Sequence, residues 1–267
     1  MTADNASAMV PVGRAPRTEQ LPLWPDQLRG VPWAALRSAL FAPVRRGARS
    51  SCQREQIASV GDYRIVYTGL RLDQADLDVY EQVLHLGRNI NLGEPVKFKT
   101  REMLRMLDRA TGKQNREWLL KSLSRLAASE VEISNGKLTY AGSLIHEQGR
   151  DEEAGMHYII LNPRLGQLYA QGWHPVRWEE RKALRGQQLA QWLHNFIAGQ
   201  QRPLTFMVED LIKLSDSNYA RVRDFRKAFD EAAEAVQGIG IPLVLLWDLG
   251  RGAANGKVTI TRKDWKS

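Results

Sequence analysis

Two short stretches of the chain carry side chains that could read the edges of DNA bases. Each stretch opens the second of two consecutive predicted helices, near residues 114 and 219. Arginine can bind guanine through two hydrogen bonds, and asparagine or glutamine can bind adenine likewise, with about 1–3 kcal/mol of discrimination from each pair. The candidate DNA-binding residues are Lys113, Gln114, Asn115, Arg116, Lys121 and Arg125 in the first stretch, and Ser217, Asn218, Tyr219, Arg221, Arg223, Arg226 and Lys227 in the second.

The competing interpretation is that both stretches are ordinary solvated helix faces. Most surface arginines and glutamines contact only water, so one such stretch alone would not decide between the two interpretations. The arrangement occurs twice, however, in a basic chain that has 38 Lys and Arg residues, 30 Asp and Glu residues and a formal net charge of +8. This balance favours a polyanionic partner, either nucleic acid or an anionic membrane surface. We therefore expect double-stranded DNA to be the partner and no membrane.

Basic residues in two predicted hairpin turns add candidate phosphate contacts. Lys137 follows the turn at Asn135-Gly136, and Arg251 and Lys257 lie in the last turn of the chain. A third turn, at residues 151–153, consists of three acidic residues that phosphates would repel. We expect the first and last turns, rather than this acidic one, to lie on DNA.

The sequence contains no complete catalytic motif. Residues 250–257 (GRGAANGK) resemble a phosphate-binding loop, but the first glycine is displaced by one position and Val258 follows the lysine. The five histidines show no metal-binding spacing, and the single cysteine, Cys52, has no neighbouring base. We therefore expect no enzymatic activity, no cofactor and no metal site, so that any work on DNA would draw on binding energy.

The elements that must position these residues form a repeat. Residues 96–145 and 204–262 both predict a short strand, two helices joined by a turn, and a β-hairpin. This order is typical of the winged-helix fold, whose second helix enters the DNA major groove. The predicted fold class is α+β, with two tandem winged-helix (helix-turn-helix plus β-hairpin) domains after a flexible N-terminal segment.

Periodicity and capping residues set the expected boundaries. Asp73 is a candidate N-cap for a helix over 74–86, and Asn135-Gly136 is a strong hairpin signal. Residues 162–178, rich in Gly, Pro and Trp, predict a joint between the halves, followed by one long helix over 179–198. The predicted divisions are residues 1–55 (flexible), 56–165 (first winged-helix domain) and 166–267 (second winged-helix domain).

The N-terminal region contains a second kind of candidate binding motif. Pro32 could open a short helix that carries Leu36, Leu40 and Phe41 on one face. Before it, apolar anchors in a flexible segment resemble the short motif that docks into the bacterial sliding clamp. The alternative is that these anchors staple the segment onto the first domain. The candidate clamp-binding residues are Gln20, Leu21, Leu23 and Trp24.

The compartment follows from three sequence features. One cysteine cannot form an internal disulfide, the N-terminus lacks the apolar core of a signal peptide, and no apolar run reaches 18 residues. We expect a cytoplasmic protein.

Four blocks of sequence, in order, resemble the TrfA family of plasmid replication initiators. The resemblance runs from about residue 21 to the C-terminus. The blocks are LPLWPDQLRGVPWAALRSALF (21–41), YTGLRLDQADLDVYEQVLHLGR (67–88), GEPVKFKTREMLRML (93–107) and GSLI (142–145).

The resemblance implies two winged-helix domains that bind directly repeated iterons at a plasmid origin. It further implies opening of adjacent A+T-rich DNA, recruitment of the host initiator, replicative helicase and clamp, and a monomer–dimer equilibrium that limits copy number. Within the motif for the clamp, Trp24 stands where the family has Phe, and Pro22 replaces a small polar residue. The alternatives from other classes are a winged-helix transcriptional repressor and a partition or adaptor protein that uses winged helices for protein contacts.

Overall fold

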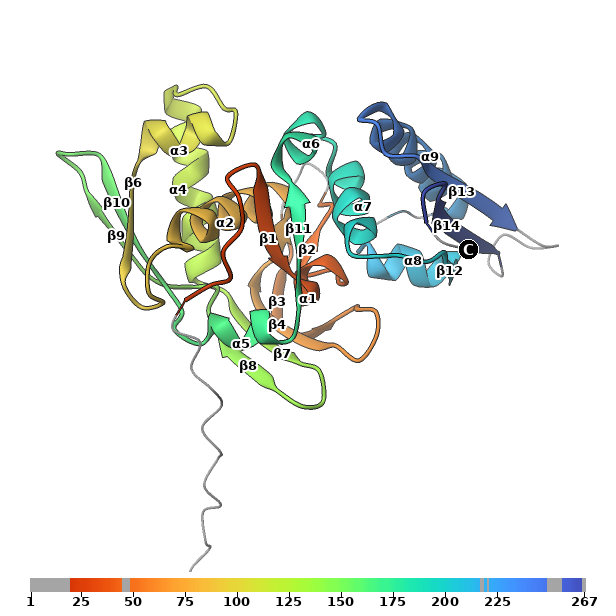
Figure 1. Cartoon of the computed structure of the whole chain (residues 1–267), viewed down its shortest axis with the longest axis horizontal. Helices are drawn as coiled ribbons and strands as arrows, with labels where there is room; N and C mark the ends of the chain where they lie inside the picture. The colour runs from red at the N-terminus through yellow and green to blue at the C-terminus, as the bar shows by residue number, and fades with distance from the viewer. Residues whose placement is uncertain (1–19, 45–48, 217–218, 220, 249–255, 266–267) are drawn as a thin grey trace, which may run out of the picture.

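The protein is represented by a computed structural model that describes residues 20–44, 49–216, 219, 221–248 and 256–265. Figure 1 shows two α+β units at opposite ends of the long axis of the molecule, joined by a central layer of helices and short strands. The predicted α+β class is confirmed. The first 19 residues of the predicted flexible N-terminal segment lie outside the described residues.

The first unit combines a helix-turn-helix with a three-stranded antiparallel sheet. Helix α3 ends where Asp108 adopts a positive φ of 53°, and the next helix begins directly after Gly112. Leu119, Leu123 and Leu126 are spaced along the inner face of that second helix and are fully buried. The elements are β6 (Pro95–Lys99), α3 (Thr100–Met106), α4 (Lys113–Ala127), β9 (Ile145–Asp151) and β10 (Met156–Leu161), with sheet order β6-β10-β9.

The second unit repeats this order of elements and this sheet topology. Its second helix buries Phe225, Phe229 and Val236 on one face, as its apolar spacing predicts. The elements are β12 (Leu204–Met207), α8 (Val208–Leu214), α9 (Val222–Gly238), β13 (Leu243–Asp248) and β14 (Lys257–Arg262), with sheet order β12-β14-β13. Each central strand, β10 or β14, pairs with the strand that precedes the helices and with the strand that follows them.

The hairpin at Asn135-Gly136 forms as predicted but belongs to a different sheet. Strand β7 pairs with β4, so the hairpin extends a separate four-stranded sheet rather than the sheet of the first unit. The hairpin that takes the place of β13–β14 in the first unit is β9–β10, with the acidic turn at its tip. The wing expected at residue 136 is therefore wrong, because a turn signal specifies which two strands pair and not which sheet they join. The four strands are β3 (Ser51–Ile57), β4 (Arg64–Leu70), β7 (Glu130–Ser134) and β8 (Thr139–Gly142), in the order β3-β4-β7-β8.

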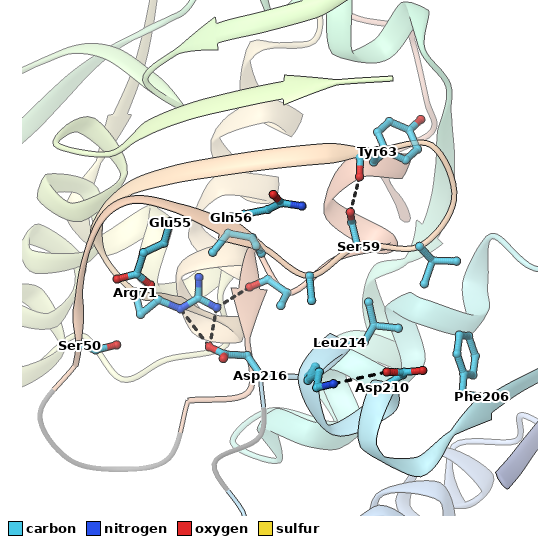
Figure 2. A pocket seen from close by; sticks show the side chains of 15 residues that line it. Ser50, Glu55, Gln56, Ser59, Tyr63, Arg71, Phe206, Asp210, Leu214 and Asp216 are labelled. Atoms are coloured by element: carbon cyan, nitrogen blue, oxygen red, sulfur yellow. Dashed lines mark hydrogen bonds and ion pairs between the residues drawn. The ribbon is translucent and has the colours of Figure 1, made fainter. Parts of the chain in front are cut away.

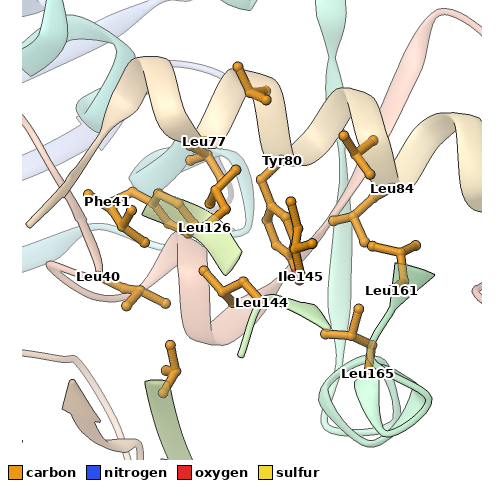
Figure 3. Packing of buried hydrophobic residues seen from close by; sticks show 14 of the residues in the cluster. Leu40, Phe41, Leu77, Tyr80, Leu84, Leu126, Leu144, Ile145, Leu161 and Leu165 are labelled. Carbon is orange, nitrogen blue, oxygen red and sulfur yellow. The ribbon is translucent and has the colours of Figure 1, made fainter. Parts of the chain in front are cut away.

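Helix α2 (Gln74–Gly87) crosses the middle of the first half and confirms the helix predicted over residues 74–86. The Asp73 carboxylate accepts from the backbone N–H of Asp76, and the Asp76 carboxylate accepts from the backbone N–H of Asp73, which completes a capping box. Figure 3 shows Leu77, Tyr80 and Leu84 on the side of α2 that packs into the first core.

Residues 20–44 and 49–55 are folded where the sequence predicts flexibility. Strand β1 pairs with β11, which lies in the predicted joint, and the apolar residues of both segments enter the cores. The helix after Pro32 spans four residues only, so Leu40 and Phe41 are buried outside it. The joint is predicted from its Gly, Pro and Trp content, but residues of these types lie in the paired strands β1 and β11. The elements are β1 (Leu28–Pro32), α1 (Trp33–Leu36), β2 (Phe41–Ala42), β5 (Leu72–Asp73), α5 (Leu165–Ala170) and β11 (Trp173–Arg177).

The single long helix expected over residues 179–198 is two helices, α6 (Trp178–Ala183) and α7 (Gln188–Ala198). The break lies at Gly186, whose φ of 85° is strained for residues with a side chain. One hydrophobic core runs from Leu21 to Trp178 and a second begins at Leu184, so the chain changes cores later than the predicted boundary at residue 165. Within the described residues, no helix is long and apolar enough to cross a membrane.

Candidate nucleic-acid interface

The start of α4 presents an exposed polar face at one end of the molecule. Lys113, Gln114 and Arg116 are exposed, and Lys121 is exposed two turns further along. The Arg116 Nε donates to the Thr111 carbonyl at 3.0 Å, which orients the guanidinium and leaves its terminal nitrogens for another partner. The half-buried Asn115 donates to the Ala110 carbonyl at 2.7 Å, so this side chain braces the turn between α3 and α4.

Arg125, placed by the sequence among the DNA-binding residues, faces the interior instead. Its Nη2 donates to Asp76 Oδ1 at 2.6 Å and its Nε to Asp76 Oδ2 at 3.2 Å. The Arg125 side chain is 13% exposed and that of Asp76 is fully buried. The pair joins α4 to the N-terminus of α2, so the structure separates Arg125 from the outer face of α4.

The start of α9 presents the equivalent face of the second unit. Arg221 and Arg223 are exposed there, Lys227 follows one turn later, and Arg226 stacks over Trp247 with its guanidinium 5.4 Å from the ring centroid. The half-buried Tyr219 packs edge-on against Phe225, so its ring anchors the turn. Ser217 and Asn218 lie outside the described residues.

The structure brings the predicted turn cations to different places. Lys257 is exposed at the start of β14, in the hairpin of the second unit, whereas Arg251 lies outside the described residues. Lys137 is exposed on the separate four-stranded sheet. Lys97, on β6 of the first unit, is an exposed cation that was not among the predicted residues. Its ammonium lies 5.4 Å from the ring of Tyr158 on the neighbouring strand β10. The alternation of polar and apolar residues over 95–99 indicates that Lys97 faces outward.

A cleft of about 880 Å³ separates the β3–β4 hairpin from α8 of the second unit. Figure 2 shows Arg71 and Asp216 meeting across it. The buried Arg71 Nη2 donates to Asp216 Oδ2 at 2.6 Å and to the Ala39 carbonyl at 2.7 Å. This ion pair joins residues from the two halves, so it fixes the second unit against the first.

The residues proposed for clamp binding lie against the first core. Leu21 and Trp24 are buried, whereas Leu23 is 68% exposed. The Trp24 ring stacks on Tyr169, and its Nε1 donates to His85 Nδ1 at 3.1 Å. Gln20 donates to the side-chain oxygen of Asn91 at 3.1 Å. This packing corresponds to the stapling alternative, and docking into another protein would require Leu21 and Trp24 to leave the core.

Titratable side chains are buried in the layer between α2 and α7 rather than at the two polar faces. Burial raises the pKa of Glu81 to about 7, against the opposing charge of the fully buried Arg181. Burial likewise raises the pKa of Cys52, which keeps its thiol protonated. Within the residues that the structure describes, no group of three His, Cys, Asp or Glu residues could hold a metal ion.

The fold resembles that of a two-domain fragment of the protein RctB. Two crystal structures of domains 2 and 3 of RctB superpose with TM-scores of 0.54 and 0.50, at 11% sequence identity. The matches cover 83% and 84% of this chain and 94% and 95% of those chains. Both likenesses concern the fold.

The sequence comparisons identify the family. The plasmid replication initiator protein TrfA of Escherichia coli is 27% identical over 229 residues, which are 82% of this chain and 59% of that protein. The chain thus spans less than two thirds of the length of that relative. The family model for TrfA proteins matches residues 18–246. With most of its length matched, and with the blocks that predicted the resemblance inside the match, the chain belongs to the TrfA family.

Proposed function

We propose that the chain is a plasmid replication initiator whose two units are winged-helix domains that bind directly repeated iterons at an origin. The observation that carries this proposal is the repeated topology: β6-β10-β9 and β12-β14-β13 follow the same helix pair in each unit. In both units the second helix begins with exposed cationic or amide side chains. Membership of the TrfA family and the name of the Escherichia coli relative support the same role.

Two DNA-binding units (the two heads of the protein) on one chain suit a DNA site with two half-sites. Second helices that enter consecutive major grooves are separated by one helical turn of DNA, about 34 Å. We propose that adjacent A+T-rich DNA opens without nucleotide hydrolysis. Bent or untwisted DNA makes more contacts with the protein, and these added contacts can supply several kcal/mol. The proposal assigns no catalytic residue, cofactor or metal to the chain.

Membership of the family is the sole support for the remaining parts of the proposed role. These are recruitment of the host initiator, the replicative helicase and the sliding clamp, and a monomer–dimer equilibrium in the cytoplasm. Binding to the clamp through Leu21 and Trp24 would cost free energy, because both side chains would have to leave the first core before they enter the pocket of the clamp. The exposed Leu23 is the anchor that is available without this exchange.

Footprinting on the origin of the plasmid that encodes the chain tests the proposal. Protection of tandem repeats in the same orientation supports initiation, whereas protection of a single palindrome supports the repressor alternative. Arg116→Ala and Arg221→Ala should each weaken specific binding by about 1–3 kcal/mol and relax base preference. Arg64→Ala is the matched control, since Arg64 is an exposed arginine on β4, in the separate four-stranded sheet.

Two outcomes would overturn the proposal. One is the absence of any sequence-specific footprint, which favours the adaptor alternative. The other is an unchanged affinity for both variants, equal for specific and random DNA, which would mean that α4 and α9 do not read bases.

A further inference from the structure

A second cleft, of about 660 Å³, lies at the junction of the two units. Its walls come from α4 of the first unit, the α6–α7 turn, the start of α2 and the turn before α9 of the second unit. Its lining includes three arginines, two aromatic side chains and one carboxylate, which are Arg49, Arg109, Arg185, Trp118, Tyr219 and Asp73.

Arg109 differs from the other arginines of this cleft in its partners. Arg49 is ion-paired with Asp73, and Arg185 lies 3.0 Å from the Asp108 carboxylate. Within the described part of the chain, Arg109 forms no ion pair, and its guanidinium instead stacks on the Trp118 ring at 3.7 Å from the centroid. Stacking on Trp118 fixes the plane of the guanidinium while its N–H edges remain available.

The electrostatic surroundings of Arg109 favour the arrival of an anion. Burial lowers the pKa of Arg109 against the opposing charge of Asp78, and the nearby charge of Arg185 lowers it further against that of Asp73. Asp108 already compensates Arg185, so a phosphate in the cleft would above all give Arg109 the anionic partner that the described residues do not supply. A planar, preoriented guanidinium also matches the two-oxygen geometry of a phosphodiester.

We propose that this cleft binds the DNA phosphodiester backbone between the two half-sites, with Arg109 and Arg185 contacting phosphates. The inference rests on the proposed function and extends it. The backbone segment that links two consecutive major grooves must pass the junction of the two heads, and the cleft lies at that junction. Phosphate contacts there would fix the register of both heads without reading sequence.

The salt dependence of DNA binding tests this proposal. For Arg109→Gln, loss of one phosphate contact should reduce the slope of log K against log salt by about 0.9 and weaken binding about five-fold near 0.15 M salt, equally for specific and random duplexes. Arg64→Gln is the matched control, because it removes the same charge at an exposed site on β4 and should change neither quantity.

The variants also separate the failure of this inference from the failure of the proposed function. If the wild-type chain shows no specific binding, the proposed function is overturned. If the wild type binds specifically but Arg109→Gln keeps the wild-type slope, or loses affinity for the specific duplex only, the phosphate cleft is overturned. Arg185→Gln provides a second measurement should Arg109→Gln fail to fold, since its 38% exposed side chain can be removed with little loss of packing, and an unchanged slope there overturns the proposal as well.

Discussion

Arg125→Ala should lower the stability of the protein and leave its salt-dependent DNA binding unchanged. The position of Arg125 on the second helix of the first unit predicts a DNA contact, whereas the structure gives its guanidinium two hydrogen bonds to the buried Asp76. The two assignments lead to different measurable results for the same substitution.

The magnitude follows from the burial of the pair. The Asp76 side chain is fully buried and that of Arg125 is 13% exposed, and removing one partner of a buried ion pair costs about 3–5 kcal/mol. Asp76 keeps hydrogen bonds from Ser122 at 2.6 Å and from Arg49 at 3.0 Å, so its charge stays compensated in part. We therefore expect the lower end of the range, about 3 kcal/mol, which for a chain of this size lowers Tm by about 6–12 °C.

Urea unfolding and DNA titration, measured on the same preparations, check this prediction. The wild type and Arg125→Ala should differ in the free energy of unfolding but share one slope of log K against log salt. Arg116→Ala should show the opposite pattern, with unchanged stability and weaker specific binding. A slope reduced by about 0.9 in Arg125→Ala, together with unchanged stability, would refute the placement of Arg125 in the interior.

Three further perturbations test other parts of the structure. Trp24→Ala should destabilise the protein by about 3–5 kcal/mol in urea unfolding, because it empties a buried site against Tyr169, and a loss below about 1 kcal/mol would mean that residues 20–44 are not part of the core. The folded state holds the proton of Glu81 more tightly than the unfolded chain does, since burial raises its pKa to about 7, so the free energy of unfolding should fall as pH rises from about 4.5 to 7. Glu81→Gln should remove that pH dependence, and an identical profile in wild type and variant would contradict the assignment. Asp216→Asn, which keeps a side chain tolerant of the positive φ at this position, should cost about 1–3 kcal/mol by leaving the buried Arg71 without its carboxylate, and in an Arg71→Met background the same change should cost almost nothing.

The elements that the sequence predicts well are those whose signals are local. Helix α2 has a side-chain cap at Asp73, a continuous apolar stripe and a terminal glycine, and its observed bounds differ from the predicted ones by one residue. The apolar spacing of α4 and α9 also identifies their buried faces, and the turn at Asn135-Gly136 pairs the two strands beside it. In each case, residues within about four positions of one another decide the structure.

The parts that sequence reasoning missed depend on partners far away in the chain. Asp78 and Glu81 occupy the polar face of α2 and would ordinarily be solvated, but Arg181, about 100 residues later in the chain, pairs with both. Trp24 fails as a sign of a flexible motif for the same reason, because its stacking partner Tyr169 lies in a segment that the sequence assigns to a joint. Periodicity within one helix contains no information about such partners.

Helix α7 shows how these distant contacts bear on the placement of the two heads. Its apolar face, with Leu193 and Phe196, packs into the second core. Its polar face is buried too: Gln191 donates to Asp78 at 3.1 Å and Asn195 donates to Glu81 at 3.3 Å, both on α2. Hydrogen bonds constrain direction as well as distance, whereas apolar packing alone permits more sliding. The polar layer between α2 and α7 therefore sets the orientation of the second unit relative to the first. Under the proposed function, a DNA site that fits both units must have one fixed separation between its half-sites.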